Sequence, residues 1–298
     1  MQDVMLCGRA ADAVRIAVDE DLSSAGDSSV APRLDATSEA FVAPDETAEG
    51  EIYAKQEGGC VVSGVSVARA VFREIDPGTI VEIHIPDGAK AARGEPIISF
   101  CGKARSILAA ERTALNFMQR MCATATLTAK FVEAVAEFGT MILDTRKTTP
   151  GLRIFEKYAV LCGGGSNHRM GMYDRILMKD NHRRLWRGGN PDALGDAVLA
   201  ARKAFPDLPV EIEVESFREC ESALSAKPEW IMLDNMPCGE MARCAKICKG
   251  ISKTEASGGI TLDRAKEVAA TGVDAISLGC LTHSAPAIDL TLEWRRAE

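Results

Sequence analysis

Short apolar runs alternate with longer amphipathic stretches over the second half of the chain, and this alternation constrains the fold more than any other feature. The runs predict strands, and several of the stretches between them have the apolar spacing of helices. Strands that alternate with helices form parallel sheets with crossover helices. The predicted strands are 141–143, 175–178, 210–214, 230–233, 253–256 and 275–278, and the predicted helices are 192–204, 217–226, 239–248 and 262–271.

The alternation alone fits both an open doubly wound sheet and an α/β barrel. Polar residues follow or end most of these strands, and in α/β barrels the carboxyl-terminal rim of the strands is where sites are built. Their positions therefore favour a barrel. The residues at these strand ends are Asp144, Lys179, Glu213, Glu215, Asp234, Ser257 and Gly279.

The first third of the chain predicts a separate, smaller α/β domain. Short runs at 51–55, 59–63, 80–85 and 97–100 predict strands, and helical spacing appears at 10–21. Residues 105–138 predict one or two helices, with a possible break at 122–126, where small and β-branched residues weaken the pattern. We place the N-terminal domain at 1–115, with the tail 286–298 packing on it, and the barrel domain at 116–285.

The charge balance excludes some functions and points to one region. The chain has 35 basic and 43 acidic residues, a net charge of −8, which argues against a nucleic-acid or anionic-membrane binder. Residues 144–184 are an exception, because nine Lys or Arg there face four Asp or Glu. We therefore expect this region to bind an anionic small molecule.

The cysteines and the absence of long apolar runs predict a cytoplasmic protein. Ten cysteines occur without a C-x-x-C pair, and 46% hydrophobic residues can supply a core without disulfides. Cys238, Cys244 and Cys248 have no nearby histidine and are expected to be buried apolar residues rather than zinc ligands. No run approaches the ~20 apolar residues of a membrane span, and no targeting signal is recognisable.

Two basic segments carry the strongest chemical signal. The first, 144–151, packs Arg146 and Lys147 among hydroxyl residues directly after a predicted strand, and guanidinium and ammonium groups bind carboxylates and phosphates. The second, 163–169, places three glycines before His168 and Arg169, so that backbone N–H groups can approach an anion closely. Lys179 ends the next predicted strand.

Carboxylates at other strand ends provide the opposite charge. Glu213 and Asp234 could hold Mg²⁺ or ribose hydroxyls, or they could simply neutralise nearby cations as buried ion pairs. The glycine-containing strand ends at Ser257 and Gly279 resemble the loops with which α/β barrels grip a phosphate.

These motifs, in this order, resemble the quinolinate phosphoribosyltransferases, also called carboxylating nicotinate-nucleotide pyrophosphorylases. The resemblance implies an N-terminal open α/β sandwich joined to an irregular, TIM-barrel-like α/β barrel, assembled as dimers or hexamers with shared active sites. It covers most of residues 100 to 290. The matching segments are 111–116, 144–151, 156–159, 163–169, 179–182, 210–215, 233–235, 255–260 and 281–284.

The resemblance also implies a role for each matching residue. Quinolinate would be held by Arg146, His168, Arg169 and Lys179, with Thr145 nearby and with Arg112 supplied by the partner subunit. Catalysis would involve Lys147, Glu213 and Asp234, the last two meeting Mg²⁺ and the ribose of phosphoribosyl pyrophosphate. The phosphate would be cradled by Ser257, Gly258, Gly259 and Gly279.

The implied reaction joins quinolinate to phosphoribose, releases pyrophosphate and CO₂, and gives nicotinate mononucleotide for NAD biosynthesis. Two alternatives remain open at this point. One is a paralogous pyrophosphorylase associated with molybdate transport, and the other is an anion-binding protein without catalytic activity. The cation set favours a dicarboxylate substrate over the first, and Glu213 and Asp234 argue against the second.

Overall fold

The computed structural model describes residues 8–295, and these form two compact units. The first unit comprises residues 8–127, 148–164 and 282–295, and the second comprises 128–147 and 165–281. No helix of the described chain is both long enough and apolar enough to cross a membrane.

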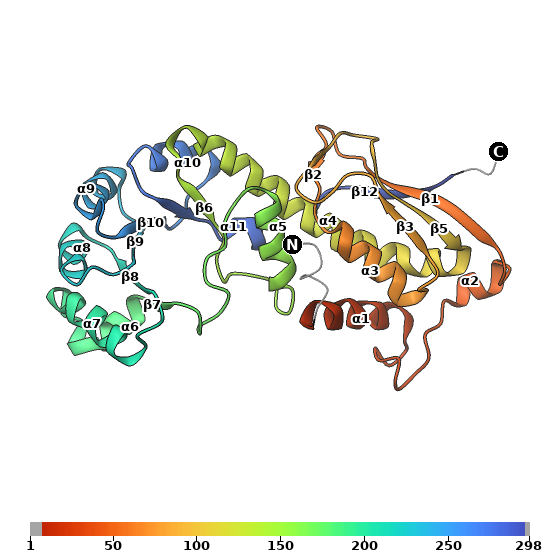
Figure 1. Cartoon of the computed structure of the whole chain (residues 1–298), viewed down its shortest axis with the longest axis horizontal. Coiled ribbons are helices and arrows are strands. Elements are labelled where there is room, and N and C mark those ends of the chain that lie inside the picture. The colour runs from red at the N-terminus through yellow and green to blue at the C-terminus, as the bar shows by residue number, and fades with distance from the viewer. Residues whose placement is uncertain (1–7, 296–298) are drawn as a thin grey trace. The chain divides into compact units, whose positions relative to one another are not determined.

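The first unit is built on a four-stranded antiparallel sheet in the order β12-β1-β5-β3 (Figure 1). Phe72 and Phe100 stack with ring centroids 5.4 Å apart, joining helix α3 to the sheet in a buried core. The strands are β1 (Thr47–Ala54), β3 (Ile80–Ile83), β5 (Pro96–Lys103) and β12 (Leu290–Trp294), with a separate pair β2 (Cys60–Val61) and β4 (Lys90–Ala91). The helices are α1 (Arg9–Leu22), α2 (Ala36–Phe41), α3 (Val65–Ile75), α5 (Arg153–Cys162) and most of α4 (Ala104–Val135).

The second unit is a six-stranded parallel sheet in the order β6-β11-β10-β9-β8-β7. Read as a circle, this order follows the chain from β6 to β11, as in an α/β barrel, with the β6 to β7 position left open. The strands are β6 (Met141–Leu143), β7 (Ile176–Met178), β8 (Val210–Val214), β9 (Trp230–Asp234), β10 (Lys253–Ser257) and β11 (Ala275–Ser277).

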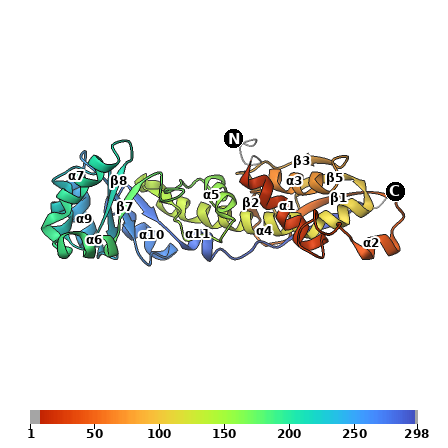
Figure 2. The ribbon, with the colours of Figure 1, turned by 90° about the horizontal axis from the view of Figure 1, so that it is seen from below.

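Helices cover the outer side of this sheet. Figure 1 shows α7, α8 and α9 outside strands β8 to β10, and Figure 2 shows the same layer from below. These helices are α6 (Asp180–Leu185), α7 (Leu194–Ala204), α8 (Phe217–Leu224), α9 (Cys238–Cys248) and α10 (Leu262–Ala269), with the short α11 (Cys280–His283) after β11. The fold class predicted from the sequence, an α/β barrel with an N-terminal α/β domain, is confirmed.

A loop occupies the free edge of β6. Ser166 forms a parallel bridge with Leu143, donating its N–H to the Ile142 carbonyl at 2.8 Å and accepting the Asp144 N–H at 3.2 Å. The loop after α5, which contains His168 and Arg169, therefore lies along the edge of β6 that pairs with no strand of the six-stranded sheet.

Most predicted elements are present, with one error and several omissions. Strands 141–143 and 210–214 have the predicted bounds, and helix 10–21 appears as α1. The break predicted at 122–126 is wrong, because α4 is continuous from 104 to 135. Cys122, Ala123, Thr124 and Ala125 are all buried, so packing overrides their weak helix preference. Helices α2, α3 and α5 and strand β12 were not predicted.

Candidate active site

The loop after β6 is anchored by Asp144. Its fully buried carboxylate accepts the backbone N–H of His168 at 2.8 Å, so the two basic segments of the sequence are tied together. The Thr145 hydroxyl accepts the Lys147 N–H at 3.0 Å, which turns the chain directly after the strand. Lys147 is exposed and Arg146 is half-buried. The predicted pairing of these two segments is thus present in the structure.

His168 is buried, and both of its ring nitrogens lie close to protein groups. Nδ1 accepts the Arg169 N–H at 2.7 Å, and Nε2 lies 3.0 Å from Oε2 of Glu211. The Arg169 guanidinium donates to the Arg175 carbonyl at 3.1 Å. These contacts fix the direction of the loop that carries Arg169.

Two guanidinium groups lie close enough to repel each other. The pKa of Arg169 is lowered, first by burial and then by the charge of Arg146, although Glu211 and Asp174 act in the opposite direction. Like charges brought together at a partly buried site favour an anion between them. This pair is the strongest electrostatic sign of an anion site.

Lys179 and Glu213 join the same rim. The Lys179 Nζ lies 3.6 Å from Glu213 Oε2, and the Asp180 N–H donates to Glu213 Oε1 at 3.1 Å. Burial raises the pKa of Glu213 and the charge of Asp234 adds to it, while the Asp180 N–H and Lys179 oppose the shift. Glu213 and Asp234 are therefore within electrostatic reach of each other.

The ends of β9 and β10 are packed against one another. The Asn235 N–H donates to the Ser257 carbonyl at 2.9 Å, and the Asn235 side chain donates to Asp234 at 2.7 Å. Gly258 has φ +101°, and a Cβ there would lie 2.2 Å from Asn235 Oδ1. Only glycine allows this approach, and Gly259 beside it faces open space.

Strand β11 completes the rim. Leu278, the residue before Gly279, donates its N–H to the Leu143 carbonyl at 2.9 Å. Parallel strands end at one edge, so twelve of the thirteen predicted site residues lie at or just after the carboxyl ends of this sheet. These are Thr145, Arg146, Lys147, His168, Arg169, Lys179, Glu213, Asp234, Ser257, Gly258, Gly259 and Gly279.

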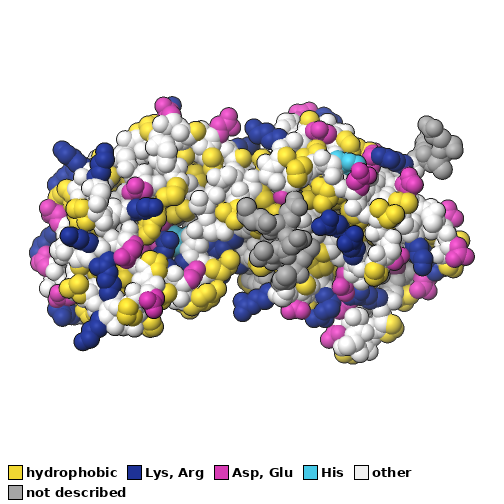
Figure 3. All heavy atoms as spheres, viewed as in Figure 1, with side chains coloured by type: hydrophobic (Ala, Val, Ile, Leu, Met, Phe, Trp, Pro, Cys, Tyr) yellow, Lys and Arg dark blue, Asp and Glu magenta, His cyan; other side chains and the backbone are white. Residues whose placement is uncertain are grey.

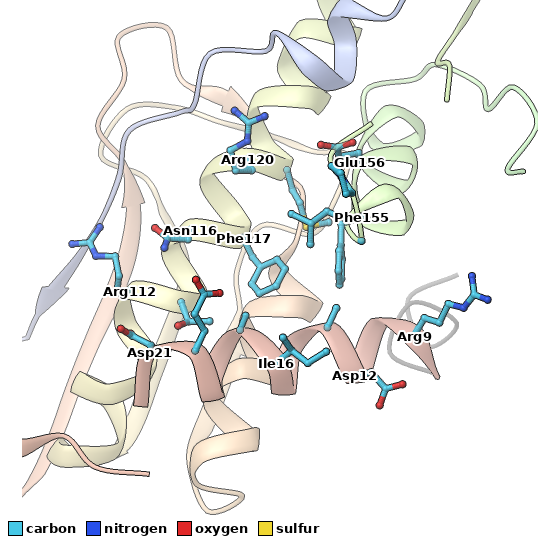
Figure 4. A pocket seen from close by; sticks show the side chains of 18 residues that line it. Arg9, Asp12, Ile16, Asp21, Arg112, Asn116, Phe117, Arg120, Phe155 and Glu156 are labelled. Carbon is cyan, nitrogen blue, oxygen red and sulfur yellow. The ribbon is translucent and has the colours of Figure 1, made fainter. Parts of the chain in front are cut away.

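The thirteenth predicted residue, Arg112, belongs to the first unit. It lies on α4 and lines a cavity of about 750 Å³ bordered by α1, α4 and α5. Figure 4 shows Arg112 and Asp21 at one end of this cavity, with Phe117 and Phe155 facing each other farther along. These two rings, 5.1 Å apart, form an aromatic part of the cavity wall.

Sequence reasoning missed a buried ionic cluster on the inner face of the sheet. Glu211, Glu255 and His168 are all buried, and Arg175 Nη1 donates to Glu211 Oε2 at 3.1 Å. The signal was available, because the alternation of β8 places Glu211 on the same face as Glu213. Other cations of the basic region are structural, as Arg183 pairs with Glu219 at 2.7 Å.

The face of the molecule seen in Figure 3 is mixed in charge. Figure 3 shows Lys and Arg side chains interspersed with Asp and Glu over the visible face. The positive charge predicted for residues 144–184 therefore matters at the rim of the sheet, where Arg146, Arg169 and Lys179 lie, and the described residues of this face form no broad basic surface.

Two family models together match most of the chain. The model described as quinolinate phosphoribosyl transferase, C-terminal domain, matches residues 124–293, and the model for the N-terminal domain of the same enzyme matches residues 35–122.

Individual proteins are similar over nearly the whole chain. The carboxylating nicotinate-nucleotide pyrophosphorylase of Mycobacterium leprae is 38% identical over 289 residues, covering 95% of this chain and 96% of that protein. The chloroplastic enzyme of that name from Oryza sativa subsp. japonica is 39% identical over 297 residues, covering 94% of this chain and 76% of that protein. The solved nicotinate-nucleotide pyrophosphorylase of Francisella tularensis superposes with a TM-score of 0.86 at 34% identity, covering 99% of this chain and 97% of the other.

Proposed function

Because the chain belongs to the quinolinate phosphoribosyl transferase family, we propose that it transfers phosphoribose from phosphoribosyl pyrophosphate to quinolinate with loss of CO₂. The products are nicotinate mononucleotide, pyrophosphate and CO₂, a step of NAD biosynthesis. The similar proteins bear the names of carboxylating or decarboxylating enzymes, which favours this reaction over that of a paralogous pyrophosphorylase.

The observation that carries the proposal is a rim with two kinds of charge. The charge of Arg146 contributes to the lowered pKa of the partly buried Arg169, whereas Glu213 and Asp234 stand at neighbouring strand ends. A pyridine dicarboxylate needs the cations, and a developing positive charge at ribose C1 is stabilised by carboxylates. A protein that only bound anions would gain nothing from the two acids.

The reaction balances with these groups. The quinolinate ring nitrogen forms the bond to C1 as the bond from C1 to pyrophosphate breaks, and the ring nitrogen becomes positively charged. The carboxylate beside that nitrogen then leaves as CO₂, its electron pair stays on the ring carbon, and a proton replaces it. Arg146, Arg169 and Lys179 would hold the two carboxylates, with His168 and Thr145 beside them, and Lys147 would lie where the ring meets the ribose.

The phosphate end of the second substrate would lie over the glycine loops. Ser257, Gly258 and Gly259 follow β10, and Gly279 follows β11, so their backbone N–H groups are candidates for the 5′-phosphate. The close packing of Gly258 on Asn235 holds this loop in one conformation.

The rim also suits Mg²⁺. Glu213 and Asp234 offer carboxylate oxygens, the ligands that Mg²⁺ prefers, and their mutual repulsion contributes to the raised pKa of Glu213. These two residues would hold an ion that phosphoribosyl pyrophosphate brings with it, and the ion would neutralise charge on the departing pyrophosphate.

We also propose that two subunits share each site. Arg112 is exposed, lies in the first unit, and borders a cavity of about 750 Å³ that is partly lined by aromatic rings. A second copy that docked there would bring its own rim to Arg112, which adds a third guanidinium for the dicarboxylate.

The nine cysteines of the described residues are free thiols, which supports a reducing compartment such as the cytoplasm.

The direct test is release of label from quinolinate that carries ¹⁴C in the carboxyl group at ring position 2. We expect Mg²⁺-dependent release of labelled CO₂ only when phosphoribosyl pyrophosphate is present, and formation of nicotinate mononucleotide in equal amount. No release at saturating concentrations of both substrates would overturn the proposed reaction.

A further inference from the structure

The inner face of the sheet holds two buried carboxylates, Glu211 and Glu255, to which the proposed reaction assigns no role. We propose that Glu211 and Glu255 are positioning residues, which act through His168 to fix Arg169 for binding the dicarboxylate. This inference rests on the proposed function, because it assigns the binding of quinolinate to the loop that contains Arg169.

The contacts form a chain from the interior to the rim. Glu211 Oε2 lies 3.1 Å from Arg175 Nη1 and 3.0 Å from His168 Nε2, and Glu255 Oε2 lies 3.5 Å from the same nitrogen. His168 Nδ1 accepts the backbone N–H of Arg169. Because that nitrogen accepts, the ring proton belongs on Nε2, where it faces the two carboxylates.

Two buried carboxylates at this distance from one imidazole require a shared proton. Glu211 Oε2 lies against both the Arg175 guanidinium and the His168 imidazole, whereas Glu255 Oε2 lies 3.5 Å from the imidazole. Burial and then the charge of Glu211 raise the pKa of Glu255 well above its usual range. A protonated Glu255 that donates to Glu211 Oε1 would satisfy one oxygen of each buried carboxylate, and the Ser277 hydroxyl is available to the other oxygen of Glu255.

A metal ion is the competing explanation for the same three residues. His168, Glu211 and Glu255 bring one ligand atom each within 4.8 Å of one another. However, the Arg175 guanidinium already lies against Glu211, and a divalent cation beside it would be repelled. The charges of the cluster sum to zero without a metal ion if Glu255 is neutral, Glu211 is ionised and Arg175 is cationic.

The cluster controls only one of the two substrate regions. The loop containing His168 is attached to β6 through Ser166 and Asp144, and the imidazole accepts the Arg169 N–H, so a shift of the imidazole should shift Arg169. The glycine loop after β10 has a support of its own, because the Asn235 N–H donates to the Ser257 carbonyl at 2.9 Å and Gly258 packs against the Asn235 side chain. Loss of the cluster should therefore weaken quinolinate binding and leave phosphoribosyl pyrophosphate binding almost unchanged.

Two matched amide variants test the inference. Glu255→Gln retains the shape and charge of a protonated acid, so the KM for quinolinate should stay within about twofold of wild type. Glu211→Gln removes the charge shared by His168 and Arg175, so the same KM should rise about tenfold or more, with the KM for phosphoribosyl pyrophosphate within about twofold. Equal effects of the two variants, or equal changes in both KM values, would overturn it.

A spectroscopic measurement makes the test independent of activity. Nitrogen-15 NMR of the ring nitrogens of the four histidines, assigned with a His168→Gln variant, should show His168 with its proton on Nε2 in the wild-type protein. A proton on Nδ1, or one equivalent of metal that is lost in Glu255→Gln, would refute the inference. A wild-type protein that releases no CO₂ would instead refute the proposed reaction, and the tautomer would still be informative.

Discussion

At the scale of single residues, the end of β10 shows how a site imposes a residue type. Gly258 has a backbone conformation that L-residues rarely adopt, and the atoms of Asn235 occupy the space where its side chain would be. The neighbouring Gly259 also has a positive φ, +57°, but nothing lies within 4 Å of its Cβ position. A substitution at Gly259 therefore measures the cost of the positive φ alone, and a substitution at Gly258 measures that cost together with the clash with Asn235.

We predict that Gly258→Ala lowers the free energy of unfolding by about 2–4 kcal/mol, because strain at a positive φ is added to a clash with backbone and side-chain atoms. Gly259→Ala should cost about 1 kcal/mol, the ordinary cost of the left-handed conformation. Urea unfolding of the two variants measures both values. Equal losses would mean that the contact with Asn235 does not restrict this loop.

The residue scale also shows what sequence reasoning could find in the site. Arg146, Arg169 and Lys179 follow strand ends or glycines, where their charge is visible in the sequence as a chemical signal. The alternation of β8 indicates the face on which Glu211 lies, but Glu211 and Glu255 were missed because the sequence gives no sign of their partners. Their pairing depends on β8 and β10 lying two strands apart in the sheet, which only the folded chain reveals.

At the scale of elements, strands β6, β7, β9 and β11 were predicted accurately because each is a short, mostly apolar run with clear ends. Helices α3 and α5 were missed for a different reason. Their sequences, VSVARAVFREI and RIFEKYAVLC, are rich in β-branched and aromatic residues, which weaken a helical signal. Burial of one face of each helix outweighs that preference.

Asp87 links these two helices. Its carboxylate accepts the N–H of Val65 at the start of α3, at 3.1 Å, and the Tyr158 hydroxyl of α5 at 2.9 Å. Burial raises the pKa of Asp87 above the ordinary value of 3.8, although these hydrogen bonds oppose the shift. The folded state therefore favours the protonated form relative to the unfolded chain.

The sign of the pH dependence follows from this shift. The protonated carboxyl contributes stability that is fully present below pH 3.8 and is lost as the pH rises through the raised pKa of the folded state. An amide cannot ionise, so the stability of Asp87→Asn relative to wild type should increase from about pH 4 to pH 7. Urea unfolding across this range measures the slope, and a difference that does not change with pH would contradict the raised pKa.

At the scale of the whole molecule, the distribution of the predicted site residues is the feature that matters most. Twelve of them belong to the second unit, and Arg112 belongs to the first. The resemblance of this chain to the family implied that Arg112 serves a neighbouring subunit. The local sequence around Arg112 does not distinguish this role from that of a surface arginine. Assembly is therefore the part of the function that a single chain could not reveal.

Subunit mixing tests this assignment. We predict that Arg112→Ala and Lys147→Ala proteins, each nearly inactive, regain about a quarter of wild-type activity after equal mixing and subunit exchange. Half of the dimers should then be mixed, and in each of these one site combines an intact Arg112 with an intact Lys147. Activity is measured by CO₂ release, and exchange is followed with two differently tagged chains.

The matched control uses two residues of the same unit. Arg146 and Lys147 lie on one loop of the second unit, so every site of a mixed Arg146→Ala and Lys147→Ala dimer lacks one of them. This mixture should stay inactive at the same degree of exchange. Recovery limited to the mixture that contains Arg112→Ala requires that Arg112 act across the subunit boundary, whereas no recovery in either mixture would place Arg112 in the site of its own chain or outside the site altogether.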